Sequence, residues 1–404
     1  MKRYVHFLSK PSAPYRIIIS TVTILSGLGA VMVLSASAVK SYEQTGSTYS
    51  IFLKQALFFT LAIAGLYIAS RMHMRIWEKL GRIAIPLALI GLVLPQLPVI
   101  GREINGNRSW IGLGPFTLQP AEFAKLFLIL FIASRLVRFE KRIENIRSGI
   151  STEHITPFDL LRDLAWGVGA IIILIMAGKD LGTALIVASI ATLMIYLSGI
   201  PLRHFAMVIF AGIVFAATFV ITQPHRIQRF AAFLHPFDPQ VYKFAGWQTA
   251  HSVMGLASGG LFGVGLGASK QKWGNLSEAN TDFIFSVIGE ELGLLGTMAV
   301  LLLFGALIYG ILRTAINTKD HFQKFAVAGI GIWLLLQVVV NIASDIGVFP
   351  VIGVTLPFIS YGGSSLIANY LGIAFVLNVL RRDPHVRAEL DHVKKNRVLR
   401  KASA

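Results

Sequence analysis

Long apolar runs separated by short polar segments fill nearly the whole of this 404-residue chain. A helix of about 20 apolar residues can cross the hydrocarbon core of a bilayer. Runs of this kind predict ten membrane-spanning helices, at about residues 17–39, 51–70, 82–100, 120–137, 163–177, 180–198, 203–221, 283–312, 325–346 and 364–380. The fold class expected from the pattern is all-α: a polytopic integral membrane protein with a large outer loop, residues 222–282, between helices seven and eight.

The distribution of Lys and Arg gives the bundle a direction. With ten spans both termini share a side, and most of the 37 basic residues fall in segments that are inside if the N-terminus is cytoplasmic. We therefore expect one integral membrane domain over 1–404, with residues 1–16 cytoplasmic, a helical core over 17–380 and a basic cytoplasmic tail at 381–404. This bias explains much of the net charge of +17, so the charge does not indicate nucleic-acid binding. Anionic membrane lipids are the expected partners of the basic tail.

Composition narrows the chemistry. The chain is 54% hydrophobic and 14% charged, which excludes a soluble enzyme. It has no cysteine, so disulfides, thiolate nucleophiles and Cys-ligated metal sites are excluded. We expect no redox role and no organic cofactor.

Three outer segments, 101–119, 222–282 and 345–363, are rich in glycine and polar residues, and we expect them to converge over one cavity. The last contains PVIGVTLPFISYGGSS, an irregular backbone at membrane depth, which is tolerated only where it is buried in protein or lines a cavity. In the first, Arg108 and Trp110 follow an Asn-Gly turn. Trp110 fits an interfacial anchor, whereas Arg108 suits a phosphate group.

Two candidate sites carry charge close to the outer surface. Glu122 and Lys125 lie three residues apart on one face of the fourth span, as a structural ion pair or as the charged wall of a substrate cavity. Lys270 and Lys272 follow a glycine-rich loop and could hold a pyrophosphate, although a solvated surface is an equal alternative. The glycines match neither a P-loop nor a dinucleotide-binding fingerprint.

Asp282 is the candidate catalytic carboxylate, because it stands where the large outer loop enters lipid. If the eighth helix begins near Asp282, then Ser286, Gly289 and Gly293 follow on the same face. The alternative is that Asp282, like Thr281, only caps this helix or complements its dipole.

Four motifs in order, RSWIGLGPFTLQPAEFAK, GLASGGLFGVGLGASKQKWG, NTDFIFSVIGEELG and LPFISYGGSS, resemble those of the SEDS family of bacterial cell-wall glycan polymerases. The resemblance covers about residues 17–381, and QKWG and TDFIF are more similar to division-type than to elongation-type members. It implies polymerisation of lipid II outside the cytoplasmic membrane, with a class B penicillin-binding protein and other divisome proteins as partners.

The resemblance also assigns roles to residues. It places the essential carboxylate at Asp282, the outer arginine and tryptophan at Arg108 and Trp110, and the intramembrane pair at Glu122 and Lys125. It implies attack of an acceptor 4-hydroxyl on the anomeric carbon of a donor, with Asp282 as general base. We expect direct displacement with inversion, because no second carboxylate is obviously placed as a covalent nucleophile. Arg108, Lys270, Lys272 or a divalent cation, Mg²⁺ or Mn²⁺, could neutralise the leaving pyrophosphate.

The chain departs from the family pattern in three places. Leu276–Glu278 and Asn280–Asp282 replace the usual Leu-Pro-Glu and His-Thr-Asp, and Gly178–Asp180 replaces Gln-Pro-Asp, where Lys179 is expected to pair with Asp180. Two other function classes also fit ten spans with intramembrane charges: a flippase for lipid-linked sugars and a non-catalytic scaffold. Against the flippase, no inverted repeat is visible and the candidate residues cluster toward the outer face.

Overall fold

The computed structural model describes residues 10–392, apart from residues 105, 115, 151, 153, 200, 204, 208, 211, 213, 215–232 and 245. Its long helices are α2 (Ala13–Thr45), α3 (Ser50–Ala69), α4 (Met74–Val93), α5 (Pro120–Arg147), α6 (Pro157–Ala177), α7 (Leu181–Tyr196), α12 (Ile284–Asn317), α13 (His321–Asp345) and α14 (Gly363–Arg382). Within the described ranges, six helices are long and apolar enough to cross a membrane, namely α2, α3, α6, α12, α13 and α14. The helical membrane bundle is confirmed, whereas the count of ten stays a prediction, because much of 203–221 lies outside the described residues.

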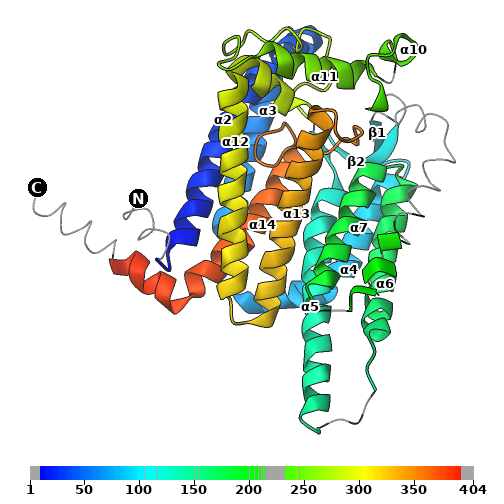
Figure 1. Ribbon diagram of the computed structural model, residues 1–404, viewed down its shortest axis with the longest axis vertical. Helices are drawn as coiled ribbons and strands as arrows, with labels where there is room; N and C mark the ends of the chain where they lie inside the picture. The colour runs from blue at the N-terminus through cyan, green and yellow to red at the C-terminus, as the bar shows by residue number, and fades with distance from the viewer. Residues whose placement is uncertain are drawn as a thin grey trace, which may run out of the picture.

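The long helices run side by side along one axis (Figure 1). α13 and α14 form the centre, since 72% and 83% of their most apolar stretches are buried, against 11% for α3. The start of α2 and the end of α14 lie at the same end of the bundle, opposite the sheet and α11 (Figure 1). An even number of spans requires this arrangement, and the cytoplasmic assignment of that end stays a prediction.

Several helices extend beyond their predicted spans, because a helix can continue past the membrane surface; α4 and α5 show this most clearly. α4 begins at Met74 instead of residue 82, because its first two turns are polar and therefore lie outside the apolar run. α5 continues to Arg147, well past residue 137, with charged residues on its last turns. Its last turns extend from the bundle at the end away from the sheet (Figure 1).

The all-α prediction is wrong for the outer segment 101–119. This segment forms an antiparallel sheet of β1 (Gly101–Ile104), β2 (Asn107–Leu113) and β3 (Phe116–Leu118) in that order. Ile104 pairs with Asn107, so the connection is two residues long, and Gly106 adopts a φ of 80°. Asn-Gly between two short strands is the usual signal of a β-hairpin, and here it marks more than the simple turn that we expected.

The large outer loop covers the same end of the bundle. α10 (Pro239–Tyr242) and α11 (Trp247–Ser258) lie across it (Figure 1), and a glycine-rich loop then leads into α12. α12 is broken at Gly293, where φ is 68° and ψ is −165°. Four backbone hydrogen bonds join the loop to the broken helix: Val264 N to Glu290 O at 2.9 Å, Gly265 N to Glu291 O at 3.1 Å, Leu294 N to Gly260 O at 2.9 Å and Leu295 N to Leu261 O at 3.2 Å. The break therefore leaves these polar groups paired, as the membrane requires.

The contact of α2 with the irregular segment before α14 makes a testable prediction. A Cβ atom at Gly29 would lie 2.5 Å from the carbonyl oxygen of Phe358 and 2.7 Å from Cα of Ile359, whereas Gly27 has no atom within 4 Å. Gly29→Ala should destabilise the protein by about 1–3 kcal/mol through overpacking. Gly27→Ala on the same helix should be neutral or stabilising by up to about 1 kcal/mol through helix propensity.

Thermal unfolding in detergent measures both variants. Equal melting temperatures for the two would contradict the close approach of α2 to residues 358–359.

Candidate functional site

Asp282 lies directly before α12, but it does not cap that helix. The N-cap position is Phe283, which has no side-chain hydrogen bond to the first turn, and Thr281 donates its hydroxyl to Glu278 instead. The expectation that Thr281 or Asp282 caps α12 is therefore wrong. Within the described part of the chain, the Asp282 carboxylate makes no hydrogen bond or ion pair.

Two other outer segments hold Asp282 in place. The side-chain amide of Asn341, on α13, donates to the carbonyl oxygens of Asp282 at 2.7 Å and of Val354 at 2.8 Å. Next to Val354, Gly353 has a φ of 76°, and a Cβ atom there would lie 3.6 Å from Oδ2 of Asp282. The segment 345–363 thus packs against Asp282, in agreement with the expected convergence.

The surroundings of Asp282 raise the pKa of its carboxyl group to about 7. Burial is the main cause, because it penalises the charged form. The nearby carboxylate of Glu278 raises the pKa further, the ammonium group of Lys40 lowers it, and Asp180 raises it slightly. Lys40 is itself paired with Glu278 at 3.5 Å, so it offsets the negative charge only in part. A carboxyl group with this pKa can accept and release a proton near neutral pH.

Asp180 connects Asp282 to the charged pair on α5. It caps α7 by accepting the backbone amide of Thr183 at 3.0 Å, and it also accepts the side-chain amide of Gln119 at 2.9 Å. Asp180 is close enough to interact electrostatically with Glu122, Lys125 and Asp282. These contacts bring the start of α5, the start of α7 and the start of α12 together.

Glu122 and Lys125 form the predicted ion pair, with Lys125 Nζ 2.8 Å from Oε1 and 2.9 Å from Oε2 of Glu122. Both side chains are buried, and the ammonium group also lies 5.4 Å from the centre of the Trp333 ring. The pair satisfies itself within the bundle, as expected of a structural ion pair. A role in substrate binding stays a prediction.

Arg108 and Trp110 lie two residues apart on β2, so their side chains project from the same face of the sheet. Both are partly exposed, whereas Ser109 between them is buried and donates its hydroxyl to the carbonyl oxygen of Gly178 at 3.3 Å. Arg102 pairs with Trp110 across the hairpin, and its guanidinium lies over Gly112 on that face. Neither Arg102 nor Arg108 makes an ion pair among the described residues. The face is basic, and the opposite side of β2, at Ser109, contacts Gly178 in the turn that leads to Asp180.

The structure separates the two candidate lysines of the glycine-rich loop. Lys272 is buried and directs its ammonium group to Glu291 at 3.0 Å, the carbonyl oxygen of Gly267 at 2.6 Å and the hydroxyl of Ser35 at 3.1 Å. Since an ammonium group has three donors, all of them are used. Lys270 is exposed, and its backbone amide donates to Glu290 at 2.9 Å. Only Lys270 therefore has an ammonium group that is accessible to a ligand, and Lys272 holds the loop.

Lys179 does not pair with Asp180 as the sequence suggested. It is exposed and adopts a φ of 62°, which is uncommon for a residue with a side chain. Asp180 is instead satisfied by Thr183 and Gln119. At the position of the family histidine, Asn280 is buried and its carbonyl oxygen accepts the backbone amide of Tyr361 at 2.8 Å.

Several residues near Asp282 were missed by sequence reasoning. They share the property that only tertiary packing brings them to the site: Lys40, Gln119 and Asn341. A polar residue inside an apolar span is the signal that could have identified Asn341, because such residues are costly in lipid and need a partner.

The described residues do not form a metal site of their own. No three His, Asp or Glu side chains in them are grouped closely enough to hold a metal ion. The Asp282 carboxylate could supply one ligand, so a divalent cation would need oxygen atoms of a bound substrate to complete its coordination.

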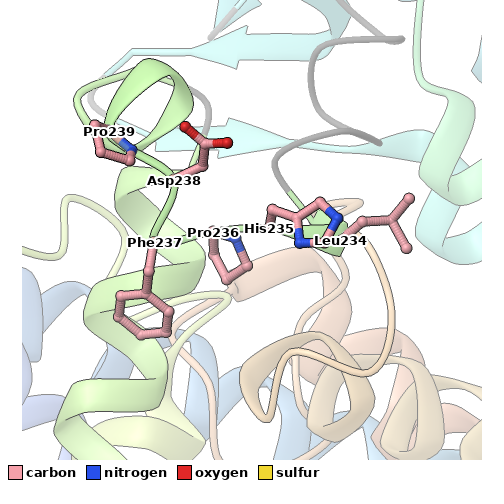
Figure 2. Close-up of a pocket in the computed structure, with 6 residues that line it drawn as sticks. All are labelled: Leu234, His235, Pro236, Phe237, Asp238 and Pro239. Atoms are coloured by element: carbon pink, nitrogen blue, oxygen red, sulfur yellow. The ribbon is translucent and has the colours of Figure 1, made fainter.

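A hollow of about 430 Å³ lies elsewhere on the large outer loop. Figure 2 shows its lining, which is a single run of chain from Leu234 to Pro239 that leads into α10. The run contributes one carboxylate, Asp238, and one imidazole, His235, and none of the candidate site residues. We therefore do not assign the hollow to the site.

Comparison with known proteins places these features in context. A family model described as "Cell cycle protein" matches residues 15–385. Stage V sporulation protein E of Bacillus subtilis (strain 168) is 33% identical over 373 residues, which cover 92% of this chain and 98% of the relative. A probable peptidoglycan glycosyltransferase FtsW of Coxiella burnetii is 36% identical over 366 residues, 90% of this chain and 95% of the relative.

Solved structures give the same picture. A chain of a peptidoglycan synthase complex, described for its coordination of polymerization and crosslinking, matches with a TM-score of 0.71 and 29% identity over 90% of this chain and 96% of that chain. The crystal structure of the rod shape determining protein RodA of Thermus thermophilus matches with a TM-score of 0.62 and 29% identity, over 90% and 95% of the two chains.

The buried pair of Lys272 and Glu291 makes a testable prediction. Lys272→Met leaves the carboxylate of Glu291, which is 1% exposed, without its cation. Loss of one partner of a buried pair costs about 3–5 kcal/mol. Lys270→Met, at the exposed lysine two residues earlier, should change stability by less than about 0.5 kcal/mol. Thermal unfolding in detergent compares the two, and similar destabilisation by both would show that Lys272 does not hold the loop.

Proposed function

Because this chain belongs to the family of FtsW, RodA and SpoVE proteins, we propose that it is a peptidoglycan glycosyltransferase that polymerises lipid II at the outer face of the cytoplasmic membrane. The observation that carries the proposal is the Asp282 carboxylate. Its backbone is fixed by Asn341, its side chain has no partner in the described residues, and its pKa is about 7. These are the properties of a general base that acts on a hydroxyl group near neutral pH.

The proposed reaction is direct displacement at an anomeric carbon. The 4-hydroxyl oxygen of the acceptor attacks the anomeric carbon of the donor, the bond from this carbon to the lipid pyrophosphate breaks, and the proton of the hydroxyl passes to Asp282. A single displacement inverts the anomeric configuration. In support, Glu278 is paired with Lys40 and Asp180 caps α7, so neither is placed as a free nucleophile.

The leaving pyrophosphate needs positive charge. We assign this role to Arg108, with Lys270 as a second cation, because both guanidinium and ammonium groups bind phosphate oxygens. Trp110 lies on the same face as Arg108 and can pack against an acyl chain or a sugar ring. Glu122 and Lys125 interact electrostatically with Asp180. Lys272 contributes by holding the glycine-rich loop against Glu291. A Mg²⁺ or Mn²⁺ ion held by the oxygen atoms of the substrate pyrophosphate would supply further positive charge.

The same reasoning gives the setting. The several apolar helices place the chain in a membrane, and the relatives named FtsW favour a role in the division machinery at the septum. The matching peptidoglycan synthase complex, which couples polymerization to crosslinking, supports a class B penicillin-binding protein as the partner. Both termini are proposed to be cytoplasmic, with Asp282 outside.

Asp282→Asn tests the function. Asparagine keeps the shape of the side chain but cannot accept the proton, so lipid II polymerisation should fall by about 10²- to 10⁴-fold. The assay follows labelled lipid II with the full-length chain, with and without the class B partner, in preparations matched for folding. Asp320→Asn is the matched control, because Asp320 caps α13 at the opposite end of the bundle and should leave activity unchanged.

Two results would count against the proposal. Full activity of Asp282→Asn would remove Asp282 as the base. An inactive wild type with a verified partner, together with movement of lipid II across vesicle membranes, would favour a flippase, whereas neither activity would favour a scaffold.

The pKa of Asp282 predicts how activity depends on pH. Since the base acts only when ionised and its pKa is raised to about 7, kcat/KM should fall about tenfold per pH unit below this value. Lys40→Met removes a charge that stabilises the ionised form, so the midpoint should move to higher pH. Glu278→Gln removes a charge that destabilises it, so the midpoint should move to lower pH. Midpoints that move together, or not at all, would show that another group controls the profile.

A further inference from the structure

Two polar residues of α13, Asn341 and Asp345, lie one turn apart on the same face of the helix. Both are buried, with 2% and 0% of their surface exposed. Asn341 donates to the carbonyl oxygen of Asp282 at 2.7 Å, and Asp345 Oδ2 accepts the backbone amide of Ser286 at 3.1 Å. The two side chains therefore hold the backbone at the aspartate that carries the proposed chemistry and at Ser286, four residues after it.

Asp345 provides a side-chain acceptor for the first turn of α12, which the residue preceding the helix does not provide. The first amides of a helix have no partner within the helix and are normally capped by the residue that precedes it. Phe283 occupies that position and has no side-chain acceptor, and the hydroxyl of Thr281 is bonded to Glu278. The Ser286 amide is shared between the backbone carbonyl oxygen of Phe283 at 3.1 Å and Oδ2 of Asp345 at 3.1 Å, so Asp345 is the side-chain acceptor for this turn. Asp345 thus caps α12 from a neighbouring helix, which leaves the carboxylate of Asp282 unused by the helix that it precedes.

Asn341 completes the arrangement from the other side. Its side-chain amide bridges the carbonyl oxygens of Asp282 and Val354. Val354 follows Gly353, the residue that lies against Oδ2 of Asp282. One amide group therefore fixes both the backbone of Asp282 and the segment beside its carboxylate.

A third helix closes on the same point. The hydroxyl of Ser252, on α11, donates to the backbone carbonyl oxygen of Asp345 at 2.7 Å and also contacts the hydroxyl of Ser286. Ser252 is fully buried. The end of α13 is therefore a junction at which α11 and α12 are both held, with little freedom to shift relative to Asp282.

The chemistry of Asp345 needs only an acceptor. Its other oxygen, Oδ1, is buried and has no hydrogen-bond partner among the described residues, and no cation is paired with the group there. A buried unpaired charge is costly, so the useful property of the side chain is the oxygen that receives the Ser286 amide. Asparagine offers the same oxygen, whereas leucine has the same branching but is larger and has no acceptor.

We propose that Asn341 and Asp345 are positioning residues that set the geometry of Asp282 through the backbone of residues 282–286. The inference rests on the proposed function, because Asn341 and Asp345 affect catalysis only through the position of Asp282 as the base. A positioning role can be distinguished from ordinary packing by comparing kcat with KM, since a displaced base lowers the rate of the chemical step more than it changes binding of lipid II.

The test measures lipid II polymerisation by the full-length chain with its partner, for Asp345→Leu and Asp345→Asn, each alone and combined with Asp282→Asn. Asp345→Leu should lower kcat by about 10- to 100-fold, as expected for a misplaced catalytic group, with a smaller change in KM. Asp345→Asn should stay close to wild type. In the Asp282→Asn background Asp345→Leu should cause little further loss, because there is no base left to position.

Asn341→Leu gives a second route to the same answer, should Asp345→Leu fail to yield folded protein. It should show the same fall in kcat and the same lack of effect in the Asp282→Asn background. Thermal unfolding of each variant reports its folding independently of activity.

Three outcomes would overturn the inference alone, in a wild type that polymerises lipid II: unchanged kcat in the leucine variants, an equal loss in both backgrounds, or an Asp345→Asn variant as defective as Asp345→Leu. An inactive wild type would instead overturn the proposed function, and the inference with it.

Discussion

The need to pair backbone polar groups at membrane depth is the constraint on which the outer end of this protein depends. Gly293 breaks α12, and the glycine-rich loop that precedes the helix returns to satisfy the groups around the break. Glu290 and Glu291, on the turn before the break, then hold the loop further: Glu290 accepts the hydroxyl of Ser269, and Glu291 accepts the ammonium group of Lys272. The glycine-rich loop, which precedes Asp282 in the sequence, is thereby fixed on α12, which follows it.

The same pairing decides the electrostatics of the site. Lys125 is neutralised by Glu122 and Lys272 by Glu291, so neither buried cation is free to stabilise the carboxylate of Asp282. Lys40 is the cation that acts on it, and it is shared with Glu278. A carboxyl group left in this partly enclosed, net negative setting has a pKa near neutrality, which a base needs and a carboxylate that forms a direct ion pair lacks.

How far the sequence could predict this arrangement depends on the range of each interaction. The Glu122–Lys125 pair is three residues apart on one helix, so periodicity alone predicted it correctly. The small sheet was missed although its Asn-Gly signal is local, because the search was for apolar runs. Lys272 and Asp345 could not be understood from the sequence, since their partners Glu291 and Ser286 are 19 and 59 residues away. The start of α12, in contrast, was predicted to within one residue, at 283 against Ile284, because the apolar run that follows it is local.

The turn at residues 178–180 shows how the chain keeps a departure from its family's pattern. Lys179 adopts a left-handed backbone conformation that a proline could not adopt, and such strain persists only where neighbours hold it. Here the carbonyl oxygen of Gly178 accepts the backbone amide of Arg108 at 2.9 Å, and Asp180 is fixed as the cap of α7. The strained residue therefore lies between two anchored neighbours, one bonded to the backbone of β2 and the other bonded to Thr183 and Gln119. The hydrogen bonds that anchor Gly178 and Asp180 do not involve the side chain of Lys179. A different residue at this position is therefore compatible with the turn as long as Gly178 and Asp180 keep their places.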